Sequence, residues 1–186
     1  MKPLTQLAHE LILQEISPGA EGRLAIDATA GNGHDTLFLA ELVGPTGRVW
    51  AVDLQDAAIT RTRERVGSLV DRVDLCVGNH ADLKSKIPLE YHGQIAIVMF
   101  NLGYLPGGEK SMITQTDSTL TAFNSAWELL VGGGLLSVIA YPGHLGGEQE
   151  ANAVADWISH RPLDVICSPS TSSPISPRHW LVRKSI

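Results

Sequence analysis

Apolar residues near the start of the chain recur at the spacing of one helix face. The positions that share this spacing are Leu4, Leu7, Ala8, Leu11, Ile12 and Ile16. Steps of three and four residues place side chains on one side of an α-helix, so the pattern predicts an amphipathic helix over residues 3–16. Pro18 and Gly19 follow directly, and we expect this pair to end the helix.

After this helix, short apolar runs alternate with stretches of helical spacing. The expected strands are Leu24–Thr29, Arg48–Asp53, Arg72–Val77, Gln94–Asn101, Leu135–Tyr141, Leu163–Cys167 and His179–Arg183. The expected helices lie at 33–43, 56–66, 80–86, 117–131 and 147–160. Strands that alternate with helices in this way predict a mostly parallel sheet covered by helices on both faces.

The last two expected strands interrupt this alternation. Residues 168–177 read Ser-Pro-Ser-Thr-Ser-Ser-Pro-Ile-Ser-Pro, which is too polar and too rich in proline for a helix. Neighbouring strands that lack a crossover helix run antiparallel. We therefore interpret this segment as a hairpin loop, and residues 1–186 as one doubly wound, Rossmann-like α/β domain. Its seven-stranded sheet should be parallel except for an antiparallel final strand.

Length, composition and charge restrict the setting in which the protein works. The 186 residues are 44% apolar, no apolar run approaches the ~20 residues that span a bilayer, and residues 1–10 lack a signal-peptide core. We therefore expect a cytoplasmic protein with no membrane association. The formal net charge of −6 argues against broad binding to long nucleic acids. The same net charge is compatible with a small surface patch that binds one RNA loop.

Two features have simple structural interpretations, and two kinds of site are absent from the sequence. Arg61, Arg63 and Arg65 alternate near the end of an expected helix, where they are typical of a solvated face. Cys76 and Cys167 each lie in an apolar run, and we expect both to be buried small hydrophobic residues. No Cys/His cluster has metal-ligand spacing, so we expect no metal site. No serine lies in a Gly-x-Ser-x-Gly nucleophile turn.

The segment Asp27-Ala-Thr-Ala-Gly31-Asn-Gly33 joins the first expected strand to a helix. Glycines at 31 and 33 allow a sharp turn and a close approach of the backbone to a ligand. The amides at the helix start then favour a carboxylate or phosphate. Asp53 ends the next strand, where an acid accepts hydrogen bonds from ribose hydroxyls. The combination predicts a site for a cofactor that carries a nucleoside.

The same segment discriminates between cofactors. The dinucleotide fingerprint requires Gly or Ala where this chain has Thr36. An acid four residues before the first glycine, here Asp27, resembles the Asp-x-x-x-Gly-x-Gly form of class I methyltransferases, which also end in an antiparallel strand. That resemblance implies S-adenosylmethionine as cofactor, with Asp27 ordering the loop near the methionine amino group and Asn79 and His80 near adenine.

Three polar clusters follow strands at the sheet edge where ligands bind in such folds. They are Asn101-Leu-Gly-Tyr104-Leu-Pro-Gly-Gly108, Tyr141-Pro-Gly-His144-Leu-Gly-Gly147 and Pro177-Arg178-His179. The first resembles the Asn/Asp-Pro-Pro-Tyr/Phe signature of amine-directed nucleic-acid methyltransferases, with Leu-Gly in place of the prolines. In that signature the Asn carbonyl accepts from the target amine and the aromatic ring stacks on a base. We expect loop 102–114, with Lys110, to close over substrate.

The sequence identifies no certain general base, and His144 and His179 are the candidates. Methyl transfer is an in-line displacement, and holding two reactants in line supplies about 7–11 kcal/mol. A positioned base supplies about 3–5 kcal/mol. Positioning is the larger contribution, so the methyltransferase hypothesis does not depend on the base, which could be water.

Together these segments resemble one bacterial family, labelled putative rRNA methylases and now associated with tRNA 5-aminomethyl-2-thiouridine methyltransferase activity at the wobble uridine. The resemblance runs from about residue 5 to the C-terminus and implies N-methylation of the exocyclic amine. The implied cofactor-binding residues are Asp27, Gly31, Asn32, Gly33, His34, Asp53, Gln55, Asn79 and His80. The implied catalytic residues are Asn101, Tyr104, Tyr141 and His144, and those binding the tRNA anticodon loop are Lys110, Arg178 and His179.

Other functions stay open at this point. A methyltransferase could act on a small-molecule amine or hydroxyl, or on rRNA. A nicotinamide-dependent oxidoreductase and a cofactor-sensing module without catalysis are alternatives from other classes. The sequence leaves the oligomeric state open, and a homodimer is compatible with it.

Overall fold

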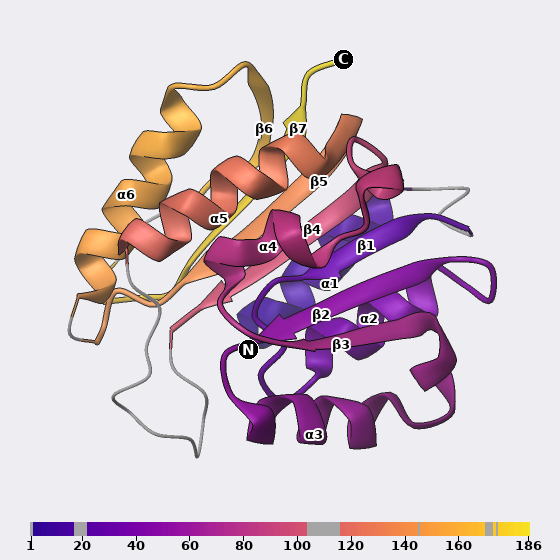
Figure 1. Cartoon of the computed structure of the whole chain (residues 1–186). Helices are drawn as coiled ribbons and strands as arrows, with labels where there is room; N and C mark the ends of the chain where they lie inside the picture. Colours follow the sequence, from indigo (N-terminus) through magenta and orange to yellow (C-terminus); the bar gives the residue numbers. More distant parts are fainter. Residues whose placement is uncertain (1, 17–21, 104–115, 145, 170–172, 174) are drawn as a thin grey trace.

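Seven strands in the described part of the chain form one twisted sheet between two layers of helices (Figure 1). The computed structural model describes residues 2–16, 22–103, 116–144, 146–169, 173 and 175–186. The strands are β1 Leu24–Asp27, β2 Arg48–Asp53, β3 Val73–Val77, β4 Ile95–Leu102, β5 Leu130–Ala140, β6 Leu163–Cys167 and β7 Arg178–Lys184. Their order across the sheet is β3-β2-β1-β4-β5-β7-β6.

The direction of the strands confirms the predicted fold class. Strands β3, β2, β1, β4 and β5 pair in parallel, and β7 is antiparallel to both β5 and β6. The chain builds outward from β1 to β2 and β3 and then crosses to β4 on the other side of β1. The carboxyl ends of β1 and β4 therefore flank the point where the strand order reverses, which is where ligands bind in open α/β sheets.

The helices divide between the two faces of the sheet (Figure 1). On one face lie α1 Leu4–Ile16, α2 His34–Leu42 and α3 Asp56–Val66, and on the other α4 Leu83–Lys86, α5 Thr116–Leu129 and α6 Gly147–Ser159. Short 3-10 helices η1, η2 and η3 cover Gly67–Arg72, His80–Asp82 and Leu89–Tyr91. The predicted helix over 80–86 is thus η2 followed by α4, and η1 and η3 were not predicted.

Alternate strand positions fill two apolar cores, one on each face. In β4, Ile97 and Met99 pack toward α1, α2 and α3, whereas Val98 and Phe100 pack toward α5 and α6. The Phe100 ring meets Phe123 edge to face at 4.8 Å between centroids. Such aromatic pairs contribute about 0.5–1.5 kcal/mol beyond their buried area. From Ile97 to Phe100 the side chains therefore alternate between the two faces, as an inner strand requires, whereas the register of β4 shifts between Ile95 and Ile97.

Helix α1 is tied to the antiparallel strand β7, although the two are distant in sequence. The Arg183 guanidinium donates from Nη2 to Glu15 Oε2 at 2.6 Å, across 168 residues, and from Nη1 to the Gly133 carbonyl at 3.0 Å. Helix α1 also packs on β5 and β7. A charge-assisted contact and an apolar face together fix the position of α1 on the sheet.

The largest error in the predicted elements lies at the start of β5. The strand begins at Leu130, not Leu135, and α5 ends at Leu129, not residue 131. Lys184 Nζ donates to the carbonyls of Trp127 at 2.6 Å and Leu130 at 2.7 Å, which satisfies the C-terminal carbonyls of α5. These partners lie more than 50 residues away, so the apolar spacing around Leu129 could not reveal the boundary.

Two further predictions are settled by the fold. The antiparallel β6–β7 pair confirms the hairpin inferred from the Ser/Pro segment, of which 170–172 and 174 lie outside the described residues. Cys76 and Cys167 are free thiols but half-buried, so the expectation of full burial was wrong. Both lie toward the edge strands of the sheet, β3 and β6, which have fewer neighbours to cover them.

Candidate active site

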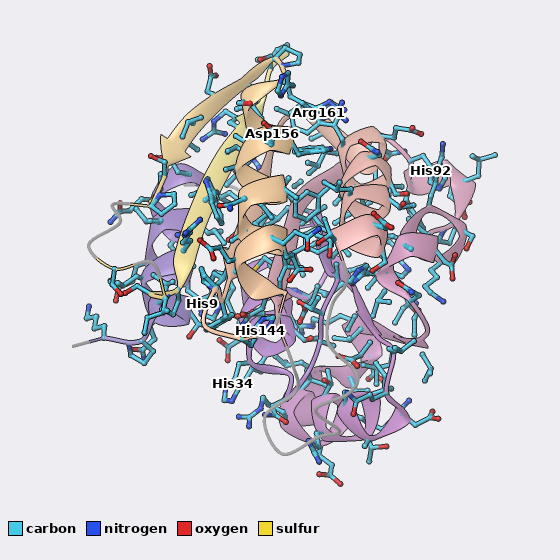
Figure 2. All side chains as sticks on the ribbon, turned by 90° about the vertical axis from the view of Figure 1, so that its left-hand side faces the viewer. His9, His34, His92, His144, Asp156 and Arg161 are labelled. Atoms are coloured by element: carbon cyan, nitrogen blue, oxygen red, sulfur yellow. The ribbon has the colours of Figure 1, made fainter. Side chains whose placement is uncertain are left out.

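The predicted site residues gather at the carboxyl edge of the parallel strands. In Figure 2, His9, His34 and His144 are labelled near one another, below the labels of His92 and Arg161. Segments that follow β1, β2 and β3 form one side of this edge, and segments that follow β4 and β5 form the other. The two sides meet at the β1–β4 boundary.

The glycine loop after β1 has the conformation that its sequence predicts. Gly31 and Gly33 have φ values of 55° and 78°, in the left-handed region that favours glycine. A Cβ on Gly33 would lie 2.8 Å from the Thr62 Cα, so α2 approaches α3 too closely for any side chain there. Gly33 therefore lets the loop turn and lets the two helices pack.

Asp53 fastens this loop to the end of β2. Its Oδ2 accepts from the Gly31 amide at 2.9 Å, and its Oδ1 accepts from the Gln55 amide at 2.9 Å. A carboxylate has about four lone-pair sites, so each oxygen keeps the capacity for one more donor. Two adjacent hydroxyls are the donors that such a carboxylate can take, as on a ribose.

Asp27 lies beneath the loop and is fully buried. Its Oδ2 accepts from Thr36 Oγ1 at 2.6 Å, and its Oδ1 accepts from the Thr29 amide at 3.2 Å. Burial, with the charges of Asp35 and Asp53 adding to it, raises the pKa of Asp27 to about 7. The predicted ordering of the loop fits these contacts, whereas direct contact of Asp27 with a cofactor does not, because no part of it is exposed.

Residues Asn79 and His80 follow β3. The Asn79 side chain accepts from the Ala81 amide at 2.9 Å and caps η2. Burial lowers the pKa of His80 to about 4, so the ring is neutral near pH 7. Among the described residues, no hydrogen-bond partner meets its Nε2. A buried polar atom of this kind is unusual, and it suits a ligand with a complementary polar edge.

Asn32 and His34 occupy the outer side of the loop. His34 is exposed, and burial of part of its ring and the charge of Arg65 lower its pKa. Asn32 accepts from Arg61 Nη1 at 3.3 Å through its side chain and from Arg65 through its backbone carbonyl. These arginines, interpreted from sequence as a solvated face, therefore bind the cofactor loop, and with Asn32 and Glu64 they line a shallow pocket.

Asn101 is the centre of the second side of the site. Its backbone amide donates to Thr29 Oγ1 at 2.7 Å, which joins the end of β4 to the end of β1. Its Nδ2 donates to Asp35 Oδ2 at 3.5 Å, and its side chain is hydrogen-bonded to Tyr141. Burial first, and the Asp35 charge second, raise the pKa of Tyr141, so its hydroxyl stays protonated.

Tyr141 and His144 close this side of the site. A Cβ on Gly103 would lie 3.5 Å from the Tyr141 ring and 3.9 Å from His144 Nε2, so the three residues are neighbours. A Cβ on Gly147 would collide with the Tyr141 carbonyl oxygen and lie 3.0 Å from the His144 ring. The glycine that begins α6 thus makes room for both side chains. The predicted catalytic residues Asn101, Tyr141 and His144 are therefore brought together.

Two predicted substrate-binding residues are placed otherwise. His179 is 4% exposed, its Nε2 lies 3.1 Å from Ser137 Oγ, and burial lowers its pKa to about 4. Arg178 donates to Asn152 at 3.0 Å and so holds α6 against β7. His179 is therefore buried against β5, and its role in substrate binding stays a prediction. Tyr104 and Lys110 lie outside the described residues.

Sequence reasoning missed four polar residues that hold the site together: His9, Thr29, Asp35 and Thr36. His9 precedes Ile12 and Ile16 by three and seven residues, the spacing of the buried face of α1. A histidine on an apolar face was the available signal. Asp35 and Thr36 follow the glycine segment directly. Thr36 was used to discriminate between cofactors, but its contact with Asp27 and the contacts of Asp35 were not predicted.

Two kinds of feature are absent from the residues that the structure describes. No group of three or more His, Cys, Asp or Glu side chains within them is arranged to hold a metal ion. None of their helices has both the length and the apolar character that a membrane crossing requires.

The strand order, the antiparallel β7 and the glycine loop define a class I methyltransferase fold. The sequence matches the family described as "Putative rRNA methylase" over residues 49–170, and the chain belongs to this family. A "putative rRNA-methylase" from Clostridium thermocellum is 34% identical, with a TM-score of 0.88 over 99% of this chain and 98% of that chain. A "putative methyltransferase" from Streptococcus mutans, solved in complex with SAH, is 30% identical, with a TM-score of 0.81 over 99% of both chains.

A curated relative carries a more specific name. The chloroplastic "tRNA (mnm(5)s(2)U34)-methyltransferase" of Arabidopsis thaliana is 39% identical over 180 residues. The match covers 89% of this chain and 63% of the relative, so the chain spans less than two thirds of that protein's length.

Proposed function

We propose that this protein is an S-adenosylmethionine-dependent methyltransferase that N-methylates the aminomethyl group of wobble 5-aminomethyl-2-thiouridine in tRNA. The observation that carries the proposal is the junction of the two sides of the site. The Asn101 amide and the Thr29 hydroxyl, 2.7 Å apart, join a candidate amine-binding residue to the glycine loop. Membership of the family and the name of the Arabidopsis relative support the choice of reaction and substrate.

The residues on the first side fit the cofactor. Asp53 would take the two ribose hydroxyls with its remaining lone pairs. The unpartnered Nε2 of His80, with Asn79 beside it, would face the adenine end. Gly31, Asn32, Gly33, His34 and Gln55 would line the rest of the cofactor through the loop that Asp27 orders. The Streptococcus mutans relative, solved with SAH, supports this assignment.

Bound S-adenosylmethionine would supply a methyl group on a sulfonium. The sulfur would be a neutral thioether leaving group as the amine lone pair forms a bond to the methyl carbon. The chain's own contribution is to orient the amine. Asn101 would accept an N–H of the amine through its carbonyl oxygen, which directs the lone pair toward the methyl group. Tyr141 and His144 would hold the nucleoside beside it. The proton released from the amine would pass to water, since positioning supplies the larger part of the rate.

The substrate side of the proposal is an RNA nucleotide presented singly. A chain with net charge −6 binds long nucleic acid poorly, whereas one splayed nucleotide needs few phosphate contacts. The loop that contains Tyr104 and Lys110 would add contacts to the anticodon loop. We propose that the reaction takes place in the cytoplasm.

The decisive experiment is nucleoside mass spectrometry of tRNA from a strain that lacks this gene. We expect 5-aminomethyl-2-thiouridine to accumulate and its N-methylated form to disappear, and the purified protein with S-adenosylmethionine to restore it. Parallel reactions with rRNA and with small-molecule amines test the alternatives. An unchanged tRNA profile, with label entering rRNA or the small-molecule fraction, would overturn the tRNA assignment.

A further inference from the structure

One carboxylate links the N-terminal helix to the proposed amine-binding residue. Asp35 is 6% exposed, and each of its oxygens meets one side chain. Oδ1 lies 2.6 Å from His9 Nε2 on α1, and Oδ2 lies 3.5 Å from Asn101 Nδ2 at the end of β4. His9 and Asn101 therefore contact the same buried carboxylate from two different elements, each through one of its two oxygens.

His9 is held in this position by more than one contact. Its ring stacks on the Phe38 ring with the centroids 3.9 Å apart and the planes 4° from parallel. Phe38 lies three residues after Asp35, so a single turn of α2 supplies both the hydrogen-bond partner and the stacking surface. The His9 side chain is 19% exposed. Helix α1, fixed by Arg183 and Glu15, carries it there.

The chemistry of the carboxylate determines how Asn101 is oriented. Oδ2 of Asp35 accepts a hydrogen bond, so its partner on Asn101 is the amide nitrogen and not the carbonyl oxygen. The carbonyl oxygen then takes the opposite side of the amide plane. Rotation of the amide by 180° would set two acceptors against each other, and His9 prevents Asp35 from turning to avoid this.

We propose that His9 and Asp35 are positioning residues that fix the amide of Asn101 with its carbonyl oxygen toward the substrate amine. The inference rests on the proposed function, because it assigns the reason for a particular orientation of Asn101. In this proposal α1 contributes a side chain to the site, in addition to packing on one face of the sheet.

The test compares three variants of the whole protein. His9→Ala removes the partner of Asp35. His9→Gln keeps an N–H donor at a reach similar to that of Nε2. Gln6→Ala changes an exposed residue on the same helix and is the matched control. We expect His9→Ala to lower kcat for tRNA methylation about 10- to 100-fold, as expected when a reacting group is misplaced. KM for the cofactor should stay within about twofold of wild type, and His9→Gln should recover most of the loss.

A second readout does not depend on activity. The side-chain amide protons of Asn101 give an NMR signal, assigned by its loss in Asn101→Asp, that reports the hydrogen bond to Asp35. We expect this signal to shift in His9→Ala and to remain near its wild-type position in His9→Gln and Gln6→Ala. If wild-type protein methylates no tRNA, the proposed function fails while this signal still tests the geometry. Equal kcat in wild type and His9→Ala, or an unmoved signal, would overturn the positioning role.

Discussion

The two sides of the site are built from contacts of different range. The side that follows β1 and β2 depends on backbone amides and short separations: Gly31 and Asp53 are 22 residues apart, and Asp27 and Thr36 are 9 apart. The side around Asn101 depends on contacts that span 66 and 72 residues, to Asp35 and Thr29. The contacts of Gly31 and Asp27 thus close within 22 residues of the chain, whereas the contacts of Asn101 exist only when elements far apart in sequence have packed.

This difference suggests that the two sides of the site have separate roles, which mutation can test. A local loop whose donors are backbone groups should set cofactor affinity. A cluster of side chains from different elements should set the orientation of the second reactant. Variants in the cofactor loop should then change the affinity for the cofactor without a change in turnover at saturating cofactor. Variants around Asn101 should change turnover without a change in cofactor affinity.

Asn101→Ala should give the largest effect, on the second side alone. We expect turnover to fall about 10²- to 10³-fold, the loss typical of removing one preorganised hydrogen-bonding group. The affinity for SAH, measured by calorimetry, should not change. Gln14→Ala, at an exposed position on α1, is the control. A large fall in SAH affinity for Asn101→Ala would contradict the division.

Asp53→Ala should give the converse result. It removes the acceptor proposed for the ribose and frees the Gly31 and Gln55 amides, and charge-assisted hydrogen bonds contribute about 1.5–3 kcal/mol each. We expect SAH affinity to fall about 100-fold. Calorimetry would compare the SAH affinity of Asp53→Ala with that of Asp71→Ala, a variant at an exposed position. Equal SAH affinities in the two variants would show that Asp53 only shapes the loop.

Thr36→Val should lower stability more modestly. The valine keeps the shape of the side chain but leaves Asp27 Oδ2 without its 2.6 Å donor in a fully buried place. An unsatisfied buried group costs about 1–3 kcal/mol of unfolding free energy. Urea unfolding of Thr36→Val beside Thr60→Val, an exposed threonine on α3, measures the difference. Equal losses in the two variants would indicate a general effect of valine in helices.

The smallest change should be in the pH dependence of stability. Burial lowers the pKa of His179 to about 4, below the ordinary value near 6.5. As pH falls from 6.5 to 4 the unfolded state gains a proton that the folded state refuses, so stability is lost, by up to about 1 kcal/mol per pH unit. Asp27, whose pKa is raised to about 7, contributes in the opposite direction, with stability lost as pH rises through the same window.

Because these contributions oppose each other, the comparison must be between variants. His179→Gln removes the titrating ring while keeping a partner for Ser137. Its unfolding free energy should fall less between pH 6.5 and 4 than that of wild type. His160→Gln, at an exposed position, should follow wild type. If the unfolding free energy of His179→Gln fell as much as that of wild type between pH 6.5 and 4, the loss of stability would not come from His179.

The range of the contacts also explains what the sequence could predict. The strands, helices and glycine loop follow from periodicity and turn chemistry, which are local, and the structure has them within a few residues. The start of β5 was wrong because Lys184 fixes the end of α5 from another strand. His179 was assigned to the site because it follows a loop at the right edge. Whether its ring turns outward or toward Ser137 depends on the strand's pairing, which one sequence does not show.

The ion pair between Arg183 and Glu15 bears on the order in which the parts of the site form during folding. It joins residues 168 positions apart and anchors the helix that carries His9. Contacts of such separation require most of the chain to be in place, since the entropy of closing long loops has to be offset first. The cofactor turn can form early from its own neighbourhood, whereas the orientation of Asn101 waits for β7. An immature chain could therefore acquire the nucleoside-binding loop well before it has a finished site for the second reactant.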